Sequence, residues 1–336
     1  MKKLLLACAG LLLVALLLRP ESSSVPARGD RLAIGTLVTV KLYQDEESAQ
    51  PLIAAAFAEF DRIDTLMSRQ IDSSAVNRLE SAAARGPVPA QEELAFVLER
   101  SQHFAQSTGG AFDVTVGALT RLWGFPEVTA PPDSDRVDSA RAQAGYRHLS
   151  LRDGMVFLER PGIRLDLGGA AKGYAVDAAV RRLQELGAEA GLVDAGGNIR
   201  YWGRKPDGEP WRFGVRHPRD PERIIEVEDI GLEGIATSGD YEQYFIHGGR
   251  RYHHILDPAT GYPAHGSVSA TAWARTAMDA DILSTAVFVL GPQRGLDWVE
   301  SQEDMEAVVF YLEDGQLRHR ASSGLARRLH FSGEED

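Results

Sequence analysis

Residues 163–186 read IRLDLGGAAKGYAVDAAVRRLQEL, a strand-like segment, a glycine turn and a helix in succession. The opening residues have the apolar pattern of a strand, two adjacent glycines break it, and Tyr174, Ala178 and Leu183 then recur at helical spacing. The glycine turn either brings the backbone close to a phosphate or cation or is purely structural. Because it lacks both G-x-G-x-x-G and a P-loop ending in G-K-[ST], the stretch predicts neither nucleotide-binding motif.

The rest of the chain alternates helical and strand-like patterns around this stretch. Apolar residues recur at three- and four-residue intervals in three other segments, which predicts helices at 49–67, 91–107 and 279–290. The other predicted elements are strands at 31–43 and 307–312, a hairpin over 149–165 turning at Asp153-Gly154, a surface loop over 124–138 and a mostly antiparallel sheet over 191–273. With no internal repeat, this mixture predicts an α+β (mixed α/β) fold, in one large domain or two closely joined lobes.

The overall charge argues against one broad class of partner. The 336-residue chain has a formal net charge of −12 and a pI near 5.3. Nucleic-acid binding requires a basic surface that neutralises phosphates, so no nucleic-acid partner is expected. An anionic small ligand would need local help from a cation or from backbone N–H groups.

The first 27 residues carry the features of an export signal. Met1-Lys2-Lys3 precedes an apolar run over 4–18, as in a secretory signal sequence or a short membrane anchor. The run is shorter than the roughly 20 residues that cross a bilayer core, which favours removal, and Val25-Pro26-Ala27 offers a cleavage site. Cys8 is similar to a lipoprotein cysteine, but its place early in the run favours an ordinary signal residue. Without Cys8 the mature chain has neither a disulfide nor a cysteine nucleophile.

Residues 276–286, TAMDADILSTA, place oxygen atoms on one face of the predicted helix at 279–290. Asp281 and Thr285 are four residues apart, so their side chains project together. A carboxylate with a hydroxyl suits a hard cation such as Mg²⁺, whereas zinc prefers nitrogen and sulfur. In the alternative interpretation, Asp279 is an ordinary first-turn acid and Thr285 bonds back to its own helix.

Two neighbouring histidines follow a polar segment, ATSGDYE at 236–242. His253 and His254 stand immediately before the turn-like stretch 255–263. An imidazole with a near-neutral pKa is the usual side chain for taking a proton from a hydroxyl nucleophile, so either histidine could be a general base. Each could equally be a structural histidine at a strand edge.

Together these segments resemble the FAD:protein FMN transferases, the ApbE family, in order and spacing from about residue 35 to residue 291. The matching blocks are Gly35-Thr36, Met67-Ser68, GAFDVTVG at 110–117, LWGF at 122–125, then 166–177, 236–242, 254–263, Ala280-Asp281 and Ser284-Thr285. The resemblance implies an ApbE-like, T-fold-like, two-lobed single domain with the flavin site between the lobes. It implies a signal over 1–27 and a flavin transferase domain over 28–336, with a flexible C-terminal tail from about residue 325.

The resemblance also implies a set of site residues. A Mg²⁺ ion would be held by Asp281, Thr285 and the backbone carbonyl of Gly169, with Ser284 beside them. The catalytic residues would be His254 and Asp281, because the family histidine falls on His254 and would deprotonate the acceptor. The implied FAD contacts are Ile34, Gln70, Ala111, Phe112, Asp113, Asp166, Lys172, Asp240 and Leu256.

The implied reaction splits FAD and transfers its FMN half to a threonine hydroxyl of an acceptor protein, with release of AMP. The implied acceptor is an exported or membrane-bound electron-transfer flavoprotein with a short threonine-containing motif. The enzyme would then be periplasmic and face the inner membrane, or be attached to it through the N-terminus. Two alternatives stay open: an exported Mg²⁺-dependent FAD pyrophosphatase that yields FMN and AMP, and a non-catalytic FAD-binding lipoprotein.

Two positions depart from the family pattern. Gln70 stands where members usually have an aromatic residue near the flavin, so stacking at this position is not expected. Glu80 replaces a frequent asparagine, although Ser74 and Arg78 fit the pattern. We expect both changes to alter FAD affinity without removing activity.

Overall fold

The structure, a computed structural model, describes residues 25–220 and 223–331. Cys8 and the apolar run over 4–18 lie outside these ranges, so the structure does not describe the predicted signal. Within the described ranges, no helix combines the length and the apolar character that crossing a membrane requires. Helices and antiparallel strands alternate along the chain, which confirms the predicted mixed α/β fold.

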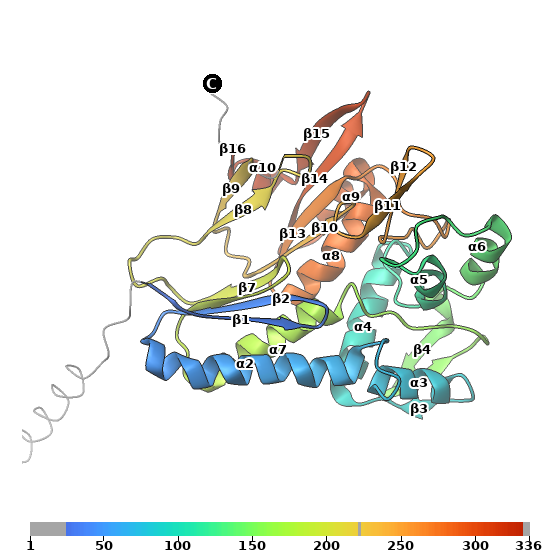
Figure 1. The fold of residues 1–336 in the computed structure, drawn as a ribbon, viewed down its shortest axis with the longest axis horizontal. Helices are drawn as coiled ribbons and strands as arrows, with labels where there is room; N and C mark the ends of the chain where they lie inside the picture. The colour runs from blue at the N-terminus through green and yellow to red at the C-terminus, as the bar shows by residue number, and fades with distance from the viewer. Residues whose placement is uncertain (1–24, 221–222, 332–336) are drawn as a thin grey trace, which may run out of the picture.

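An eight-stranded antiparallel sheet forms the centre of the molecule (Figure 1). In spatial order its strands are β1 (Ala27–Ala33), β2 (Thr36–Leu42), β6 (Gly191–Ala195), β7 (Asn198–Trp202), β10 (Gly234–Gly239), β13 (Ser269–Ala274), β14 (Met305–Glu313) and β15 (Gln316–Ala321). The predicted antiparallel strands within 191–273 and the predicted strand at 307–312, inside β14, are therefore confirmed. Every residue of β13 is buried, as expected for a strand that is covered on both faces.

The first two strands form a hairpin, so the prediction of one strand over 31–43 is wrong. The chain reverses at Ile34-Gly35, and Ala33 pairs with Thr36 across the turn. Both turn residues have positive φ, 42° at Ile34 and 75° at Gly35, as two-residue hairpin turns of this type require. A β-branched residue rarely adopts this conformation, which explains why the sequence did not reveal a turn.

Nine α-helices lie within the described ranges, and the four longest are the predicted ones. They are α2 (Glu46–Met67), α3 (Ala75–Ala83), α4 (Glu92–Ser107), α5 (Gly117–Trp123), α6 (Ser134–Arg141), α7 (Ala171–Glu185), α8 (Ala277–Leu290), α9 (Pro292–Val299) and α10 (Ser323–Ala326). The predicted loop over 124–138 is wrong in its second half, because α6 begins at Ser134. Only Val137 and Ala140 of α6 are buried, so its apolar periodicity is too short to detect.

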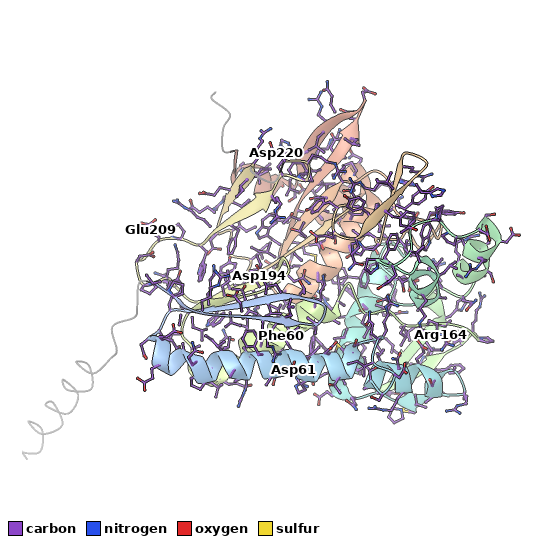
Figure 2. All side chains as sticks on the ribbon, in the orientation of Figure 1. Phe60, Asp61, Arg164, Asp194, Glu209 and Asp220 are labelled. Atoms are coloured by element: carbon purple, nitrogen blue, oxygen red, sulfur yellow. The ribbon has the colours of Figure 1, made fainter. Side chains whose placement is uncertain are left out.

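The amphipathic helix α2 packs beneath β1 and β2 and beside α7 (Figure 1). Phe60 of α2 is fully buried, whereas the neighbouring Asp61 is exposed and pairs with Arg31 of β1 (Figure 2). This alternation around the helix is what places one face of α2 in the main core.

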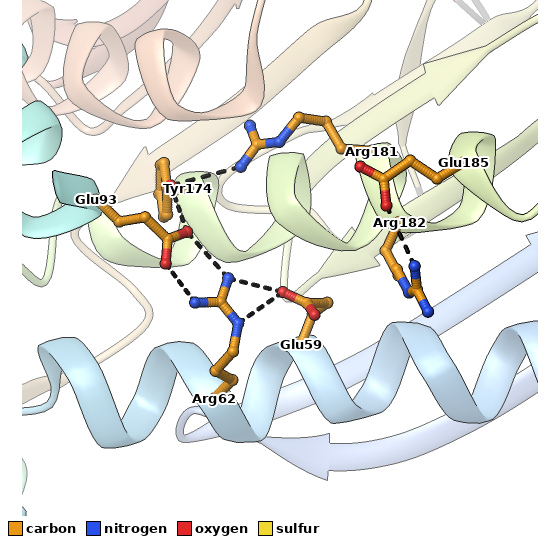
Figure 3. A network of polar contacts seen from close by, with 7 residues as sticks. All are labelled: Glu59, Arg62, Glu93, Tyr174, Arg181, Arg182 and Glu185. Carbon is orange, nitrogen blue, oxygen red and sulfur yellow. Dashed lines mark hydrogen bonds and ion pairs between the residues drawn. The ribbon is translucent and has the colours of Figure 1, made fainter.

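A polar network at the edge of this core joins three helices (Figure 3). Arg62 of α2 contacts Glu59 and Glu93, and Glu93 of α4 accepts a hydrogen bond of 2.7 Å from the hydroxyl of Tyr174 on α7. Arg181 of α7 also reaches the Tyr174 hydroxyl, at 3.4 Å. Partial burial and the negative charge of Glu93 raise the pKa of Tyr174 to about 12, so its hydroxyl stays a donor at neutral pH. The network fixes the direction of α7, which carries part of the candidate site.

Three smaller sheets surround the main one. Their strands are β8 (Arg212–Arg216), β9 (Ile224–Glu228) and β16 (Leu329–Phe331); β3 (Val88–Pro89), β4 (Leu149–Arg152) and β5 (Met155–Leu158); and β11 (Tyr244–His247) with β12 (Arg250–His253). The predicted hairpin at Asp153-Gly154 is confirmed as β4–β5, although it ends at Leu158. A short 3₁₀ turn, Tyr146–His148, precedes it.

The C-terminal segment is part of the fold up to Phe331, and the flexibility predicted from about residue 325 stays a prediction. Leu325 is fully buried within α10. The strand β16 pairs with β9 through Leu329 and Val227, which are about a hundred residues apart in the sequence. Such pairing leaves no local pattern that a sequence could reveal.

Candidate active site

At the centre of the candidate site, each of two helices supplies a carboxylate that accepts backbone N–H groups in the first turn of the other helix. The carboxylate of Asp177, on α7, accepts the backbone N–H groups of Ala277 (3.0 Å) and Met278 (2.9 Å) at the start of α8. In return, Oδ2 of Asp281, on α8, accepts the N–H of Gly173 (3.0 Å) at the start of α7. First-turn N–H groups lack partners within their own helix, and carboxylates there interact favourably with the helix dipole. Asp281 is thereby held beside the glycine turn that begins α7.

Gly173 permits the close contact between these helices. A Cβ atom at this position would lie 2.4 Å from the carbonyl oxygen of Ala277 and 2.6 Å from Cα of Met278. No side chain fits there without separating the two helices. The glycine in the quoted Ala-Lys-Gly-Tyr sequence is therefore required by packing.

The four predicted metal-site residues lie together. The hydroxyls of Ser284 and Thr285 both donate to the backbone carbonyl of Asp281, at 2.9 and 3.3 Å. A Cβ atom on Gly169 would lie 3.3 Å from Oγ1 of Thr285, which brings the glycine turn against α8. Ser238 of β10 joins them, with its Oγ 2.9 Å from Oγ of Ser284 and 3.2 Å from Oγ1 of Thr285. The result is a compact group of oxygen atoms.

The donor set fits a hard divalent cation. Asp281 is buried, and burial raises the pKa of its carboxyl, although the positive charge of Lys172 and the N–H of Gly173 partly oppose this. A buried carboxylate is costly unless a cation or several hydrogen bonds compensate it. In the described part of the chain no three His, Cys, Asp or Glu side chains gather as a zinc site would require, whereas carboxylate, hydroxyl and carbonyl oxygens suit Mg²⁺.

The two histidines have different environments. Nε2 of His253 lies 3.0 Å from the carbonyl oxygen of Ala264, and its ring packs edge-on against Phe288 at a centroid distance of 5.3 Å. His254 lies near Lys172 and Asp166, whose charges act on its pKa. Burial, with the neighbouring charges of His253 and Lys172, lowers the pKa of His254 to about 4. His254 therefore lies near Lys172 and Asp166, and His253 is near a different expected site residue, Asp240.

The folding stability of the protein should fall as the pH drops from 6.5 to about 5. Burial lowers the pKa of His253 from 6.5 to about 4, so in this window the unfolded chain binds a proton that the folded chain does not. We expect His253 alone to account for a loss of about 1.5 kcal/mol of unfolding free energy. Urea unfolding of the wild type and of His253→Gln at both pH values measures the effect. An equal pH dependence in the two proteins would contradict the assignment.

Two of the residues expected to contact flavin, Phe112 and Asp166, contact the glycine turn, and Asp113 is hydrogen-bonded within its own segment. Oδ1 of Asp113 accepts the N–H and hydroxyl of Thr115, at 2.8 and 2.6 Å. Oδ1 of Asp166 accepts the N–H of Gly168 at 2.9 Å, which stabilises the glycine turn. The ring of Phe112 lies against Gly169, with Cε2 3.0 Å from the position of a Cβ there. These contacts connect the 111–113 segment to the glycine turn.

The other expected flavin contacts are more dispersed. Asp240 forms a bidentate ion pair with Arg219, at 2.8 and 2.5 Å, so both of its carboxylate oxygens already have partners. Leu256 is buried in a separate aromatic cluster that includes Trp123 and Phe245. Three residues were also expected to contact flavin: Ala111, which is buried, Ile34 at the tip of the β1–β2 hairpin, and the exposed Gln70, whose Oε1 accepts the Ser68 hydroxyl at 3.0 Å. Within residues 25–220 and 223–331, neither Ile34 nor Gln70 forms a hydrogen bond or ion pair with the group of oxygen atoms around Ser284 and Thr285.

Three residues of the site were not predicted. Ser238 lies within the 236–242 block but had no assigned role. The buried amide of Asn198, in the second glycine turn, approaches the Asp281 carboxylate without reaching standard hydrogen-bond geometry. Asp177 ends the 166–177 block and caps α8. A polar residue inside an otherwise apolar helix was the available signal for Asp177 alone.

Replacing Asp177 with alanine should destabilise the protein by about 3 kcal/mol. The change removes the carboxylate that accepts two backbone N–H groups at the start of α8. It also leaves the partly buried Arg200 without its main partner, because Arg200 pairs with Asp177 at 2.8 Å. Urea unfolding measures the loss. Glu185→Ala is the control, because Glu185 lies on the same helix in an exposed pair with Arg182 and should change stability by less than about 0.5 kcal/mol. Equal stability of the two variants would rule out the capping role.

Comparison with known proteins gives one consistent result. Residues 34–309 match the sequence model of the ApbE family. The FAD:protein FMN transferase of Treponema pallidum (strain Nichols) is 34% identical over 322 residues, covering 89% of this chain and 87% of that protein. The crystal structure of the ApbE protein from Thermotoga maritima superposes with a TM-score of 0.82 at 32% identity, covering 90% of this chain and 99% of that one. The apo crystal structure of the flavinyl transferase ApbE from Pseudomonas stutzeri gives 0.80 at 31% identity, over 90% and 96%. This chain belongs to the ApbE family.

Proposed function

We propose that this protein is an FAD:protein FMN transferase that requires Mg²⁺ and modifies a threonine of its acceptor. The observation that carries the proposal is the contact between the Asp281 carboxylate and the N–H of Gly173 at the start of α7, with Asp281 on the same helix as the Ser284 and Thr285 hydroxyls that meet Ser238. Family membership supports the activity, because relatives at 31–36% identity have this name.

The proposed reaction breaks the phosphoanhydride bond of FAD and forms a phosphoester bond to the acceptor. The threonine oxygen attacks the phosphorus of the FMN half of FAD, and the bond from that phosphorus to the AMP oxygen breaks. AMP leaves with the electron pair of that bond, and the hydroxyl proton passes to Nδ1 or Nε2 of His254. The product carries FMN on a phosphoester.

Each residue of the site would have a distinct task. Asp281, Thr285, Ser284 and the carbonyl of Gly169 would hold Mg²⁺, which when bound neutralises the pyrophosphate charge. Lys172, whose positive charge reaches both Asp281 and His254, would interact with the same phosphates. His254 is held neutral by its lowered pKa, so it can accept a proton across the physiological pH range.

The cellular setting is part of the proposal. The signal-like residues 1–27 support export, with the mature enzyme in the periplasm and facing the inner membrane or tethered to it. The acceptor would then be an exported or membrane-bound electron-transfer protein. Export can be measured by fractionating cells that produce the full chain, and retention in the cytoplasm would contradict it.

The activity can be tested with purified protein, FAD, Mg²⁺ and an acceptor domain that carries a single target threonine. Intact-protein mass spectrometry should show an FMN-sized mass gain on the acceptor and an equal amount of AMP. The gain should be absent with EDTA and with a Thr→Val acceptor. Free FMN and AMP with an unmodified acceptor would instead identify a pyrophosphatase, and intact bound FAD would identify a storage protein.

A further inference from the structure

A pocket lined entirely by polar side chains lies next to the candidate active site. Its cavity volume is about 460 Å³, and five arginines line it: Arg69, Arg78, Arg85, Arg121 and Arg164. Two carboxylates, Asp72 and Glu80, are also present, so the lining has a net charge of plus three in a protein whose net charge is −12. We call this feature the arginine pocket. Arg164, at the end of the molecule that contains α3, marks its position in Figure 2.

The buried Glu80 holds the wall of this pocket in place. Glu80 is 3% exposed. Its Oε1 accepts a hydrogen bond of 2.6 Å from Nη1 of Arg164 and lies 3.9 Å from Nη2 of Arg121. Its Oε2 accepts the N–H of Leu165 at 2.7 Å, which fixes α3 to the strand-like segment before the glycine turn. Glu80 therefore organises the pocket.

The remaining arginines leave positive charge free for a ligand. Arg78 donates to the backbone carbonyl of Ser73, and within the described ranges neither Arg78 nor Arg85 pairs with an acidic side chain. Guanidinium groups bind carboxylates and phosphates in a planar, two-point manner. No apolar or aromatic side chain lines the pocket, so it lacks the apolar surface that usually encloses a flat ring system such as a flavin. The lining suits several small anionic groups.

The pocket is connected to the reaction site through one ion pair. Nε of Arg69 lies 3.2 Å from Oδ2 of Asp166, whose Oδ1 accepts the N–H of Gly168 in the glycine turn. A chain that reached the oxygen cluster could therefore extend its neighbouring residues into the arginine pocket. Carboxylates on either side of a target threonine would meet arginines in the pocket. The acidic surface outside the pocket would repel the same carboxylates.

The position of the pocket also argues against an anionic lipid surface. The N-terminal segment enters the fold at Ala27, which pairs with Leu42 near the start of α2 (Figure 1). Arg69 stands two residues beyond Met67, at the opposite end of α2. A helix of 22 residues is about 33 Å long, so the pocket is far from the point at which the N-terminal segment enters the fold. A membrane contacted through that segment would lie at the opposite end.

We propose that the arginine pocket binds carboxylates of the acceptor protein that flank its target threonine. The proposal rests on the proposed transferase function, for which it supplies a basis of acceptor choice. It predicts that acceptors with aspartate or glutamate near the threonine bind more tightly than their amide counterparts.

The test uses two fluorescently labelled peptides, one with a threonine flanked by aspartates and one in which asparagine replaces each aspartate. Fluorescence anisotropy should show that the full mature chain binds the aspartate peptide about tenfold more tightly. The preference should fall close to one in Arg85→Gln/Arg121→Gln, and it should weaken in high salt, which screens exposed charges. The control is Arg318→Gln, an exposed arginine on β15, which should keep the preference.

Five results discriminate between the possibilities. Equal binding of the two peptides by the wild type, or an unchanged preference in the double variant, would overturn the proposal. The proposal would also be overturned if anionic phosphatidylglycerol vesicles bound the wild type and not the double variant, while the wild type showed no preference between the two peptides. An FAD affinity weakened more than about threefold in the double variant would instead place the pocket within the FAD site. Pocket-dependent peptide binding without any FMN-sized mass gain would support the pocket and contradict the transferase function, so the two proposals fail separately.

Discussion

Replacing Asp281 with asparagine is expected to lower FMN transfer at least about a thousandfold without reducing stability. The variant keeps an oxygen that can accept the N–H of Gly173, but it loses the only carboxylate among the four predicted metal-site residues. Because burial raises the pKa of Asp281, an uncharged amide of the same shape is easier to bury in the absence of metal. Transfer is measured by acceptor mass, and stability by thermal unfolding.

The same pair of proteins tests metal binding without measuring activity. Mg²⁺ should raise the Tm of the wild type by mass action and leave that of Asp281→Asn unchanged. Asp279→Asn is a matched control, because Asp279 lies two residues earlier on α8 and pairs with Arg100, at 2.7 and 3.1 Å. It should keep the Mg²⁺ response. Loss of the response in Asp279→Asn, or its survival in Asp281→Asn, would show that the metal site has been assigned incorrectly.

How much of the fold could be predicted depended on the length of each element. α2, α4, α7 and α8 each extend over several turns, so their apolar faces repeat often enough to be recognised. The eight-residue helix α6 buries only two side chains, and the turn at Ile34-Gly35 contains a β-branched residue in place of the usual Asn-Gly. β16 is recognisable only through its pairing with β9. Short elements and long-range pairing carry too little local information.

The site was predictable where its residues share one element. Asp281 and Thr285 stand one helical turn apart, so spacing alone brought them together. Ser238 reaches them only because β10 packs against α8, a contact across more than forty residues. The Asp177 cap likewise joins segments a hundred residues apart. Glu80 was visible as a departure from the family pattern, but its role depends on Arg164 and Leu165 in another segment.

The choice between the two histidines also depended on tertiary structure. Neighbouring residues at the end of a strand point in different directions, so one sequence position separates a structural histidine from a candidate base. His253 contacts Ala264 and Phe288, and His254 lies near Lys172 and Asp166. The neighbourhood of His254, together with the family resemblance, supports the proposal that His254 is the base.

Replacing His254 with alanine should lower FMN transfer by about two to four orders of magnitude while FAD affinity changes little, because a general base acts on the proton and not on the flavin. His253→Gln is the control and should retain most of the activity, since Nε2 of His253 contacts the backbone carbonyl of Ala264. FAD affinity is measured by flavin fluorescence and transfer by acceptor mass. If His253→Gln lost transfer as severely as His254→Ala, the assignment of the base would be wrong.

The pH dependence of transfer gives an independent test of the same role. Without substrate the pKa of His254 is about 4, which keeps the imidazole neutral but makes it a weak base at neutral pH. The negative pyrophosphate of bound FAD would favour the charged imidazolium and raise this pKa towards the working pH. NMR titration should therefore show a higher pKa for His254 in the FAD complex than in the free protein, and the acidic limb of the rate profile should follow the higher value. Bound FAD would in this way strengthen the base that deprotonates the acceptor threonine. Deprotonation of the threonine would then be efficient only when FAD is bound.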